Sequence, residues 1–90
     1  MTEETKLPKL TEKYGIYRCI SFNVPDAWYE IVDECLAELS KLPDWDPDLV
    51  AQVKQKFYEL RIYLDGNLGQ NKEAQAIVRK AEAKANEVEP

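Results

Sequence analysis

The sequence predicts a mostly α fold, a compact three-helix domain with an extended N-terminal segment. Three separate stretches carry apolar residues at intervals of three and four, which is the spacing along one side of an α-helix. Prolines and glycines separate these stretches, as is typical of turns between helices. A shorter stretch before them alternates apolar and polar residues, which is typical of extended chain.

The chain begins with a polar segment, residues 1–13, which we expect to form a flexible arm. Residues 14–88 are expected to form a single small domain, because 90 residues suffice for one core. The polar, partly acidic start is unlike a secretory signal, and no apolar run approaches the roughly 18 residues of a membrane span. We therefore expect a soluble, cytoplasmic protein.

Residues 14–22 are rich in β-branched and aromatic side chains. Ile16, Ile20 and Phe22 fall on one side of an extended chain, with Tyr17 and Cys19 on the other. This alternation predicts a half-buried strand, the extended N-terminal segment of the domain.

The first predicted helix begins near Pro25 and ends before Pro43. Proline suits a first helical turn because its missing N–H has no partner there, and it disfavours helix at the residue before it. The apolar side of this helix carries Trp28, Ile31, Val32, Cys35, Leu39 and Leu42.

The second predicted helix runs from Pro47 to Leu64, with Asp46 as its N-cap. Its apolar residues step by four, four, three and four: Leu49, Val53, Phe57, Leu60 and Leu64. An alternative remains open, because residues 60–64 also alternate apolar and polar side chains. They would then form a strand that pairs with residues 16–22, and the fold would be α+β.

The third predicted helix begins at Asn71, with a narrow, alanine-rich apolar side. The three helices together predict one core of Trp28, Ile31, Cys35, Leu39, Val53, Phe57, Leu60 and Ile77. In that arrangement Phe57 is fully buried, and Phe57→Ala costs about 3–5 kcal/mol of stability.

The residue inventory predicts that the protein is not an enzyme and needs no cofactor. The chain has no histidine, so neither Ser21, Ser40 nor the cysteines have the usual base of a nucleophile. Two cysteines without histidine do not complete a tetrahedral zinc site, so we expect no metal. Cys19 and Cys35 are expected to be reduced, although the sequence leaves their oxidation open.

Acidic residues gather in the first predicted helix. The segment 26–48 holds eight acids but only Lys41 as a base, and the whole chain has a formal net charge of −5. Five of these acids recur on one side of the helix: Asp26, Glu30, Asp33, Glu34 and Glu38. A face of this charge favours a non-enzymatic binding protein whose partner is a protein with a basic surface.

A second hypothesis is a small nucleic-acid-binding protein. Bases and aromatic residues interleave in the second predicted helix, at Lys54, Lys56, Tyr58, Arg61 and Tyr63. Such a patch can contact phosphates and stack on bases. A third hypothesis is a structural homo-oligomer, formed through strand edges or surplus aromatic residues. None of the three involves a membrane.

The stretch from Gln52 to Tyr63 resembles the Q-V-K-x-K-F-x-x-L-R-x-Y motif of a group of small, uncharacterised bacteriophage and prophage proteins. Residues 24–29 and 81–82 are also similar to segments of that group. The resemblance implies a phage-encoded accessory protein that acts on a host protein. Where the group has glycine after the motif's phenylalanine, this chain has Tyr58, and we expect that difference to favour a continuous helix.

Overall fold

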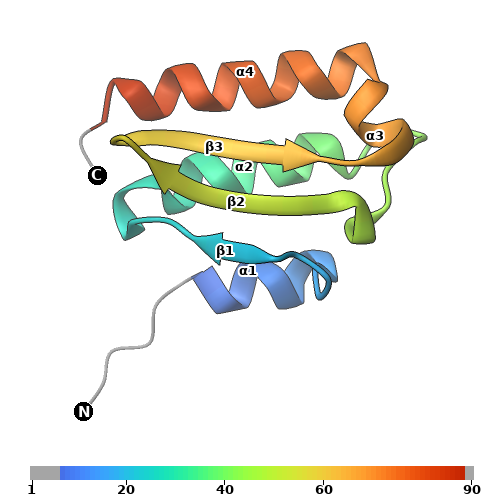
Figure 1. Ribbon diagram of the computed structural model, residues 1–90, viewed down its shortest axis with the longest axis horizontal. Coiled ribbons are helices and arrows are strands. Elements are labelled where there is room, and N and C mark those ends of the chain that lie inside the picture. The colour runs from blue at the N-terminus through green and yellow to red at the C-terminus, as the bar shows by residue number, and fades with distance from the viewer. Residues whose placement is uncertain (1–6, 89–90) are drawn as a thin grey trace.

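A computed structural model describes residues 7–88 and shows an α+β fold, with a three-stranded sheet among the helices (Figure 1). In chain order the elements are α1 (Leu7–Tyr14), β1 (Ser21–Asn23), the 3-10 turn η1 (Asp26–Trp28), α2 (Tyr29–Leu39), the 3-10 turn η2 (Pro47–Leu49), β2 (Val50–Lys56), β3 (Glu59–Leu64), α3 (Gly66–Gln70) and α4 (Lys72–Asn86).

The sheet has the strand order β1-β2-β3. β1 and β2 are parallel, with Phe22 beside Val53, and α2 makes the crossover that a parallel pair requires. β2 and β3 form an antiparallel hairpin, with Val53 opposite Ile62. A bulge between Val50 and Gln52 shifts the register of β2.

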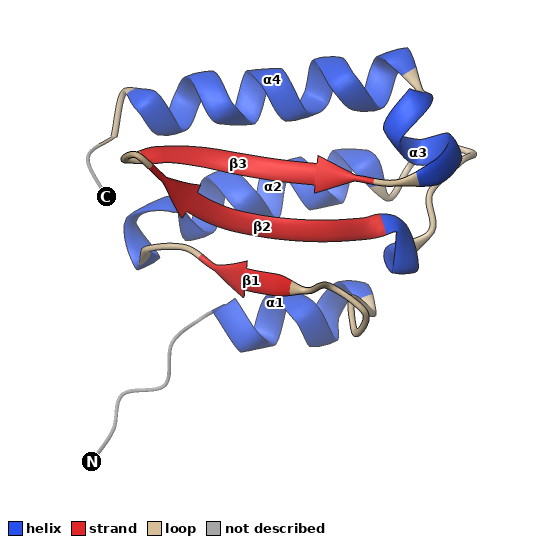
Figure 2. Cartoon of the chain, in the orientation of Figure 1, coloured by secondary structure: helices blue, strands red, loops and turns tan. Residues whose placement is uncertain are grey.

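The helices α2 and α4 pack against each other and cover one face of the sheet, while α1 lies beside β1 (Figures 1 and 2). The core lies between these helices and the sheet. Its largest fully buried side chains are Trp28, Leu10, Ile16, Leu36, Leu39, Leu60 and Leu68. No helix lies in front of the opposite face of the sheet in Figure 1, so that face is uncovered within residues 7–88.

The expected three-helix fold is wrong, because residues 47–64 are a turn and a hairpin rather than a helix. Asp46 is an N-cap as predicted. It caps the turn that begins at Pro47, and its carboxylate accepts from the backbone N–H of Asp48 at 3.0 Å. However, the capped segment is one 3-10 turn that leads directly into β2. The α+β alternative fits, but β3 pairs with β2 rather than with residues 16–22.

The turn of the hairpin is made by Phe57 and Tyr58, which have φ values of 54° and 65°. Two consecutive left-handed residues match the right-handed twist of a hairpin and normally call for Asn-Gly. Tyr58 occupies the position where the resemblance has glycine, and it adopts the left-handed conformation. The expectation that its side chain favours a continuous helix is therefore wrong.

Phe57 does not belong to the core. Its side chain is 80% exposed, because the turn directs it into solvent. The other residues of the predicted core are placed as expected: Trp28, Cys35, Leu39, Val53 and Leu60 are buried, and Ile31 and Ile77 are partly buried against them.

Two further expectations, both for the N-terminal side of the chain, differ from the structure. Part of the segment expected as an arm is helix α1, in which Leu10 is fully buried, so ordered structure begins before residue 14; residues 1–6 lie outside the described part. The strand expected over residues 14–22 is only Ser21–Asn23. Ile16 is buried whereas Ile20 is 80% exposed, so the two do not share a side. Among the described residues, none of the helices is long and apolar enough to cross a membrane.

Candidate binding surfaces

The acidic side of α2 faces lysines from α4. Lys84 Nζ lies 2.7 Å from Glu34 Oε1, and Lys80 Nζ lies 2.9 Å from Glu38 Oε1. A step of four forward along α2 is matched by a step of four back along α4, so the two helices run antiparallel. These ion pairs neutralise much of the negative charge that the sequence places on this side.

A third acid of the set, Asp33, is bound by α1. Tyr14 Oη donates to Asp33 Oδ1 at 2.5 Å, and Lys13 Nζ lies 3.0 Å from the same oxygen. Burial raises the pKa of the Asp33 carboxyl, but the hydrogen bonds from Tyr14 and Lys13 outweigh it and hold that pKa below its usual value. The carboxylate ties α1 to the middle of α2.

The remaining two acids, Asp26 and Glu30, are exposed, and no lysine or arginine among the described side chains, residues 10–88, forms an ion pair with either. Asp26 lies in η1 and Glu30 at the start of α2, next to the end of α4, since the indole N–H of Trp28 donates to the carbonyl of Val88 at 2.9 Å. The α2–α4 ladder ends here because α4 supplies no further lysine. Negative charge therefore remains at this end of the molecule.

The uncovered face of the sheet gathers four residues of the predicted nucleic-acid patch. Register places Lys54 opposite Arg61 and Gln52 opposite Tyr63, and alternation puts Lys56 on the same side. Lys54 Nζ lies 5.7 Å from the centre of the Tyr63 ring, within cation–π range. The predicted patch thus lies across two strands rather than along a helix.

The positive charge of this face is smaller than its composition suggests. Arg61 Nη2 lies 2.6 Å from Glu59 Oε1 on the same strand, so one of the three bases is paired. The fifth residue, Tyr58, lies beyond the face in the hairpin turn, where it is 79% exposed.

The hairpin turn presents two large aromatic side chains to solvent. Phe57 and Tyr58 are adjacent, and Lys56 Nζ approaches the Phe57 ring to 5.8 Å. Figure 1 shows the turn at the same end of the molecule as the start of α2 and the end of α4. We call this the tip end: the turn at Phe57 and Tyr58, with Asp26 and Glu30.

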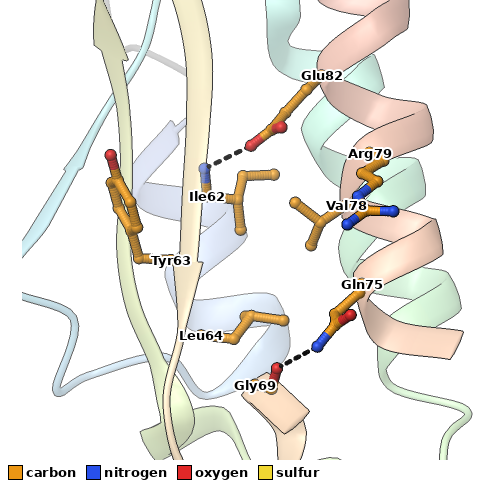
Figure 3. Close-up of a pocket in the computed structure, with 8 residues that line it drawn as sticks. All are labelled: Ile62, Tyr63, Leu64, Gly69, Gln75, Val78, Arg79 and Glu82. Atoms are coloured by element: carbon orange, nitrogen blue, oxygen red, sulfur yellow. Dashed lines mark hydrogen bonds between the residues drawn. The ribbon is translucent and has the colours of Figure 1, made fainter. Parts of the chain in front are cut away.

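A groove that the sequence does not predict lies between β3 and α4. Its volume is about 230 Å³, and Figure 3 shows Ile62 and Leu64 facing Val78 across it. Glu82 Oε2 accepts from the backbone N–H of Ile62 at 3.3 Å, so the side chain reaches the free edge of the strand. The groove exists because β3 pairs at the edge of a sheet, whereas the sequence predicts a helix for these residues.

Both cysteines are free thiols. Cys35 lies in the core, and burial raises its pKa to about 12, with smaller contributions from nearby acids such as Glu38. Burial also raises the pKa of Cys19. Neither thiol has the lowered pKa of a reactive cysteine. No cluster of three or more metal-binding side chains occurs within the described part of the chain.

No family model matches the chain, and no curated protein or solved structure shows significant similarity to it. The resemblance to small phage proteins therefore stays a prediction from the motif.

Proposed function

We propose that this chain is a non-enzymatic binding protein that docks a partner protein through its tip end. The observation that carries the proposal is the hairpin turn, in which two exposed aromatic residues are held in left-handed backbone. The left-handed conformation costs a non-glycine residue roughly 1–2 kcal/mol. Strain combined with exposed apolar surface is expected where a residue serves recognition rather than folding.

Aromatic side chains suit this role because they contribute much of the binding energy at protein interfaces. Phe57 and Tyr58 form a tight two-residue turn between paired strands, so little backbone freedom is lost when their side chains enter an apolar pocket. Asp26 and Glu30 supply unneutralised charge at the same end. The partner that fits is a protein with an apolar pocket and basic residues around it.

Fewer acids of the acidic side of α2 are available to a partner than the sequence suggests. Of its five acids, Asp33, Glu34 and Glu38 are engaged within the chain, so Asp26 and Glu30 are the ones free to steer a basic partner. A phage-encoded accessory protein that occupies a host protein would have this design, and we extend the proposal to that setting on the strength of the motif.

The test is capture of partners from a bacterial lysate by immobilised wild-type protein and two variants. Phe57→Asn combined with Tyr58→Gly restores a favourable turn sequence, so the hairpin is kept while both aromatic anchors are removed. Tyr17→Ser is the matched control, because Tyr17 is also an exposed aromatic residue, at 72%, but lies outside the tip end.

We expect a protein retained by wild type and Tyr17→Ser and lost from the double variant. Asp26→Asn with Glu30→Gln should slow association with that protein at low salt, whereas Glu34→Gln should not. Equal retention by the double variant and wild type would refute docking through the turn.

A second candidate function rests on a separate observation, the register that places Lys54, Arg61 and Tyr63 on the uncovered face. Short single-stranded nucleic acid could lie across this face, with a base on Tyr63. Gel shifts with short single and double strands, across a salt series, test this candidate. Salt-sensitive binding that weakens in the Lys54→Ala, Arg61→Ala variant would replace protein docking as the leading function.

A further inference from the structure

The groove between β3 and α4 has the features of a site for an extended chain. An edge strand exposes N–H and C=O groups that can pair with another strand. The N–H of Ile62 points away from β2, since it donates to Glu82 of α4 rather than into the sheet. By the alternation of an antiparallel pair, Leu60 and Leu64 point their backbone groups the same way.

The carboxylate of Glu82 occupies the position that a strand carbonyl would take. It accepts from a backbone N–H at the sheet edge, but a side chain supplies one acceptor where a strand would supply a ladder. The 3.3 Å distance is long for a charge-assisted hydrogen bond, which is usually about 2.7–2.9 Å. An incoming carbonyl can therefore replace it without the loss of a short bond.

The size of the groove selects the occupant. At about 230 Å³ it is smaller than the roughly 300–1,000 Å³ of small-molecule pockets, and it has room for a side chain of a peptide whose backbone lies along the strand edge. Ile62, Leu64 and Val78 line it with apolar surface, so an apolar side chain fits between the strand and the helix.

One end of the groove is bridged, and a cation lies one helical turn from the bridge. Gln75 Nε2 donates to the carbonyl of Gly69 at 3.0 Å, as the dashed line in Figure 3 shows. Arg79, which lines the groove, is exposed and forms no ion pair with an acid of residues 7–88. A closed end beside an unpaired guanidinium suits a chain that terminates there in a carboxylate.

We propose that the β3–α4 groove binds the C-terminal segment of a partner protein as a fourth strand beside β3, with the terminal carboxylate at Arg79. The segment runs parallel to β3, since it ends at the bridge made by Gln75. Its backbone carbonyl takes the place of Glu82 on the N–H of Ile62. This site is separate from the tip end, so it goes beyond the docking proposed above.

The probe is a displayed library of random peptides with free C-terminal carboxylates, selected against the full chain. The strongest peptide is then synthesised as the free acid and as the C-terminal amide. We expect the amide to bind about tenfold more weakly, because it lacks the charge that faces Arg79. On binding of the acid, the amide resonances of Leu60, Ile62 and Leu64 should shift and the Ile62 N–H should exchange more slowly.

Four variants of the chain locate the contact. Arg79→Gln should weaken the acid peptide about tenfold, whereas Lys72→Ala, an exposed base of α4 outside the groove, should not. Glu82→Ala should tighten binding, since the competing carboxylate is removed. The double variant of Phe57 and Tyr58 should bind the peptide as wild type does, so failure at the tip end and failure in the groove remain distinguishable.

Equal affinity for acid and amide, or resonance shifts that avoid residues 60–64, would overturn the proposal. So would the absence of any selected peptide from wild type and Glu82→Ala alike. If Glu82→Ala instead dimerises through β3 and takes no peptide, the occupant of this edge is a second copy of the chain.

Discussion

The two ends of the molecule differ in whether their polar groups have partners within the chain and whether their apolar side chains are exposed. We call the end opposite the tip end, with α3 and the start of α4, the closed end; there Asn71 Oδ1 accepts from the backbone N–H groups of Glu73 and Ala74, and its Nδ2 donates to Asp44. At the tip end, Asp26 and Glu30 have no cationic partner in the described chain, and aromatic side chains stand in solvent.

This difference separates the groups that hold the fold from those that are available for contact. Caps and tight turns at the closed end satisfy backbone groups locally. Local strain and unneutralised charge occur at the tip end, beside a core that contains the fully buried Trp28. The contrast predicts that substitutions at the closed end lower stability, while a turn sequence that favours left-handed backbone raises it.

The largest expected effect tests the core beneath the tip end. Trp28 is fully buried and joins the start of α2 to the end of α4 through its bond to Val88. Trp28→Ala should lower the free energy of unfolding by about 3–5 kcal/mol in urea titrations. Trp28→Phe keeps most of the packing and should cost less; equal losses would mean that the indole N–H dominates.

The second-largest expected change in stability is at the closed end, in α3. A β-carbon added at Gly69 would lie 2.6 Å from the carbonyl oxygen of Leu64, so α3 could no longer approach the end of β3. Gly69→Ala should lower the free energy of unfolding by about 1–3 kcal/mol, as overpacking does. An unchanged thermal midpoint would show that α3 can move away from β3 without cost.

Replacement of both turn residues is expected to raise the free energy of unfolding rather than lower it. Phe57→Asn with Tyr58→Gly should raise the free energy of unfolding by about 1–2 kcal/mol, because the left-handed conformation is then relieved. Phe57→Ala keeps the strained backbone and removes only exposed surface, so its stability should stay within about 0.5 kcal/mol of wild type. A loss of stability in the double variant would mean that the aromatic residues support the fold.

The smallest effect concerns the link between α1 and α2. The folded-state pKa of Asp33 lies below its usual value of 3.8, so its contribution is present above that pH and is lost as pH falls through the folded-state pKa. The stability difference between wild type and Asp33→Asn should therefore shrink in melts below about pH 4. A difference that stays constant down to pH 2 would contradict the bond to Tyr14 and Lys13.

The helical layer could be predicted from the sequence, because its signals are local. The stripe of α2 is given by the spacing of Trp28, Cys35 and Leu39, and all three are buried. The position of Asp46 as a cap was also predictable. The length of the capped element was not predictable, since the same aspartate serves an α-helix or a single 3-10 turn.

The prediction of a helix over the hairpin residues is wrong for two physical reasons. The bulge after Val50 breaks the alternation of β2, so Val50 and Val53 are both buried, three residues apart as on a helix. The turn lacks the Asn-Gly signal, because Phe57 and Tyr58 take its left-handed positions. The alternation of Leu60 and Ile62 was the correct signal.

The candidate sites also contain residues that the sequence predicts and residues that it does not. Lys54, Arg61 and Tyr63 were singled out from composition, and the strand register brings them to one face although the predicted helix was wrong. The lysines that neutralise Glu34 and Glu38 come from α4, 50 and 42 residues away in sequence, and no local pattern reveals them. The charge of a helix face is therefore a property of the fold rather than of the helix.

The reactivity of the buried Cys35 thiol can report how often the core opens. Burial raises the pKa of this thiol to about 12, so the thiol is protonated at pH 8, and the core shields it from reagents. In a Cys19→Ser variant, which lacks the more accessible thiol, a thiol-reactive dye can therefore label the chain only when the core around Cys35 opens. The labelling rate in native buffer measures how often that happens, and a bound partner that clamps the tip end would slow it.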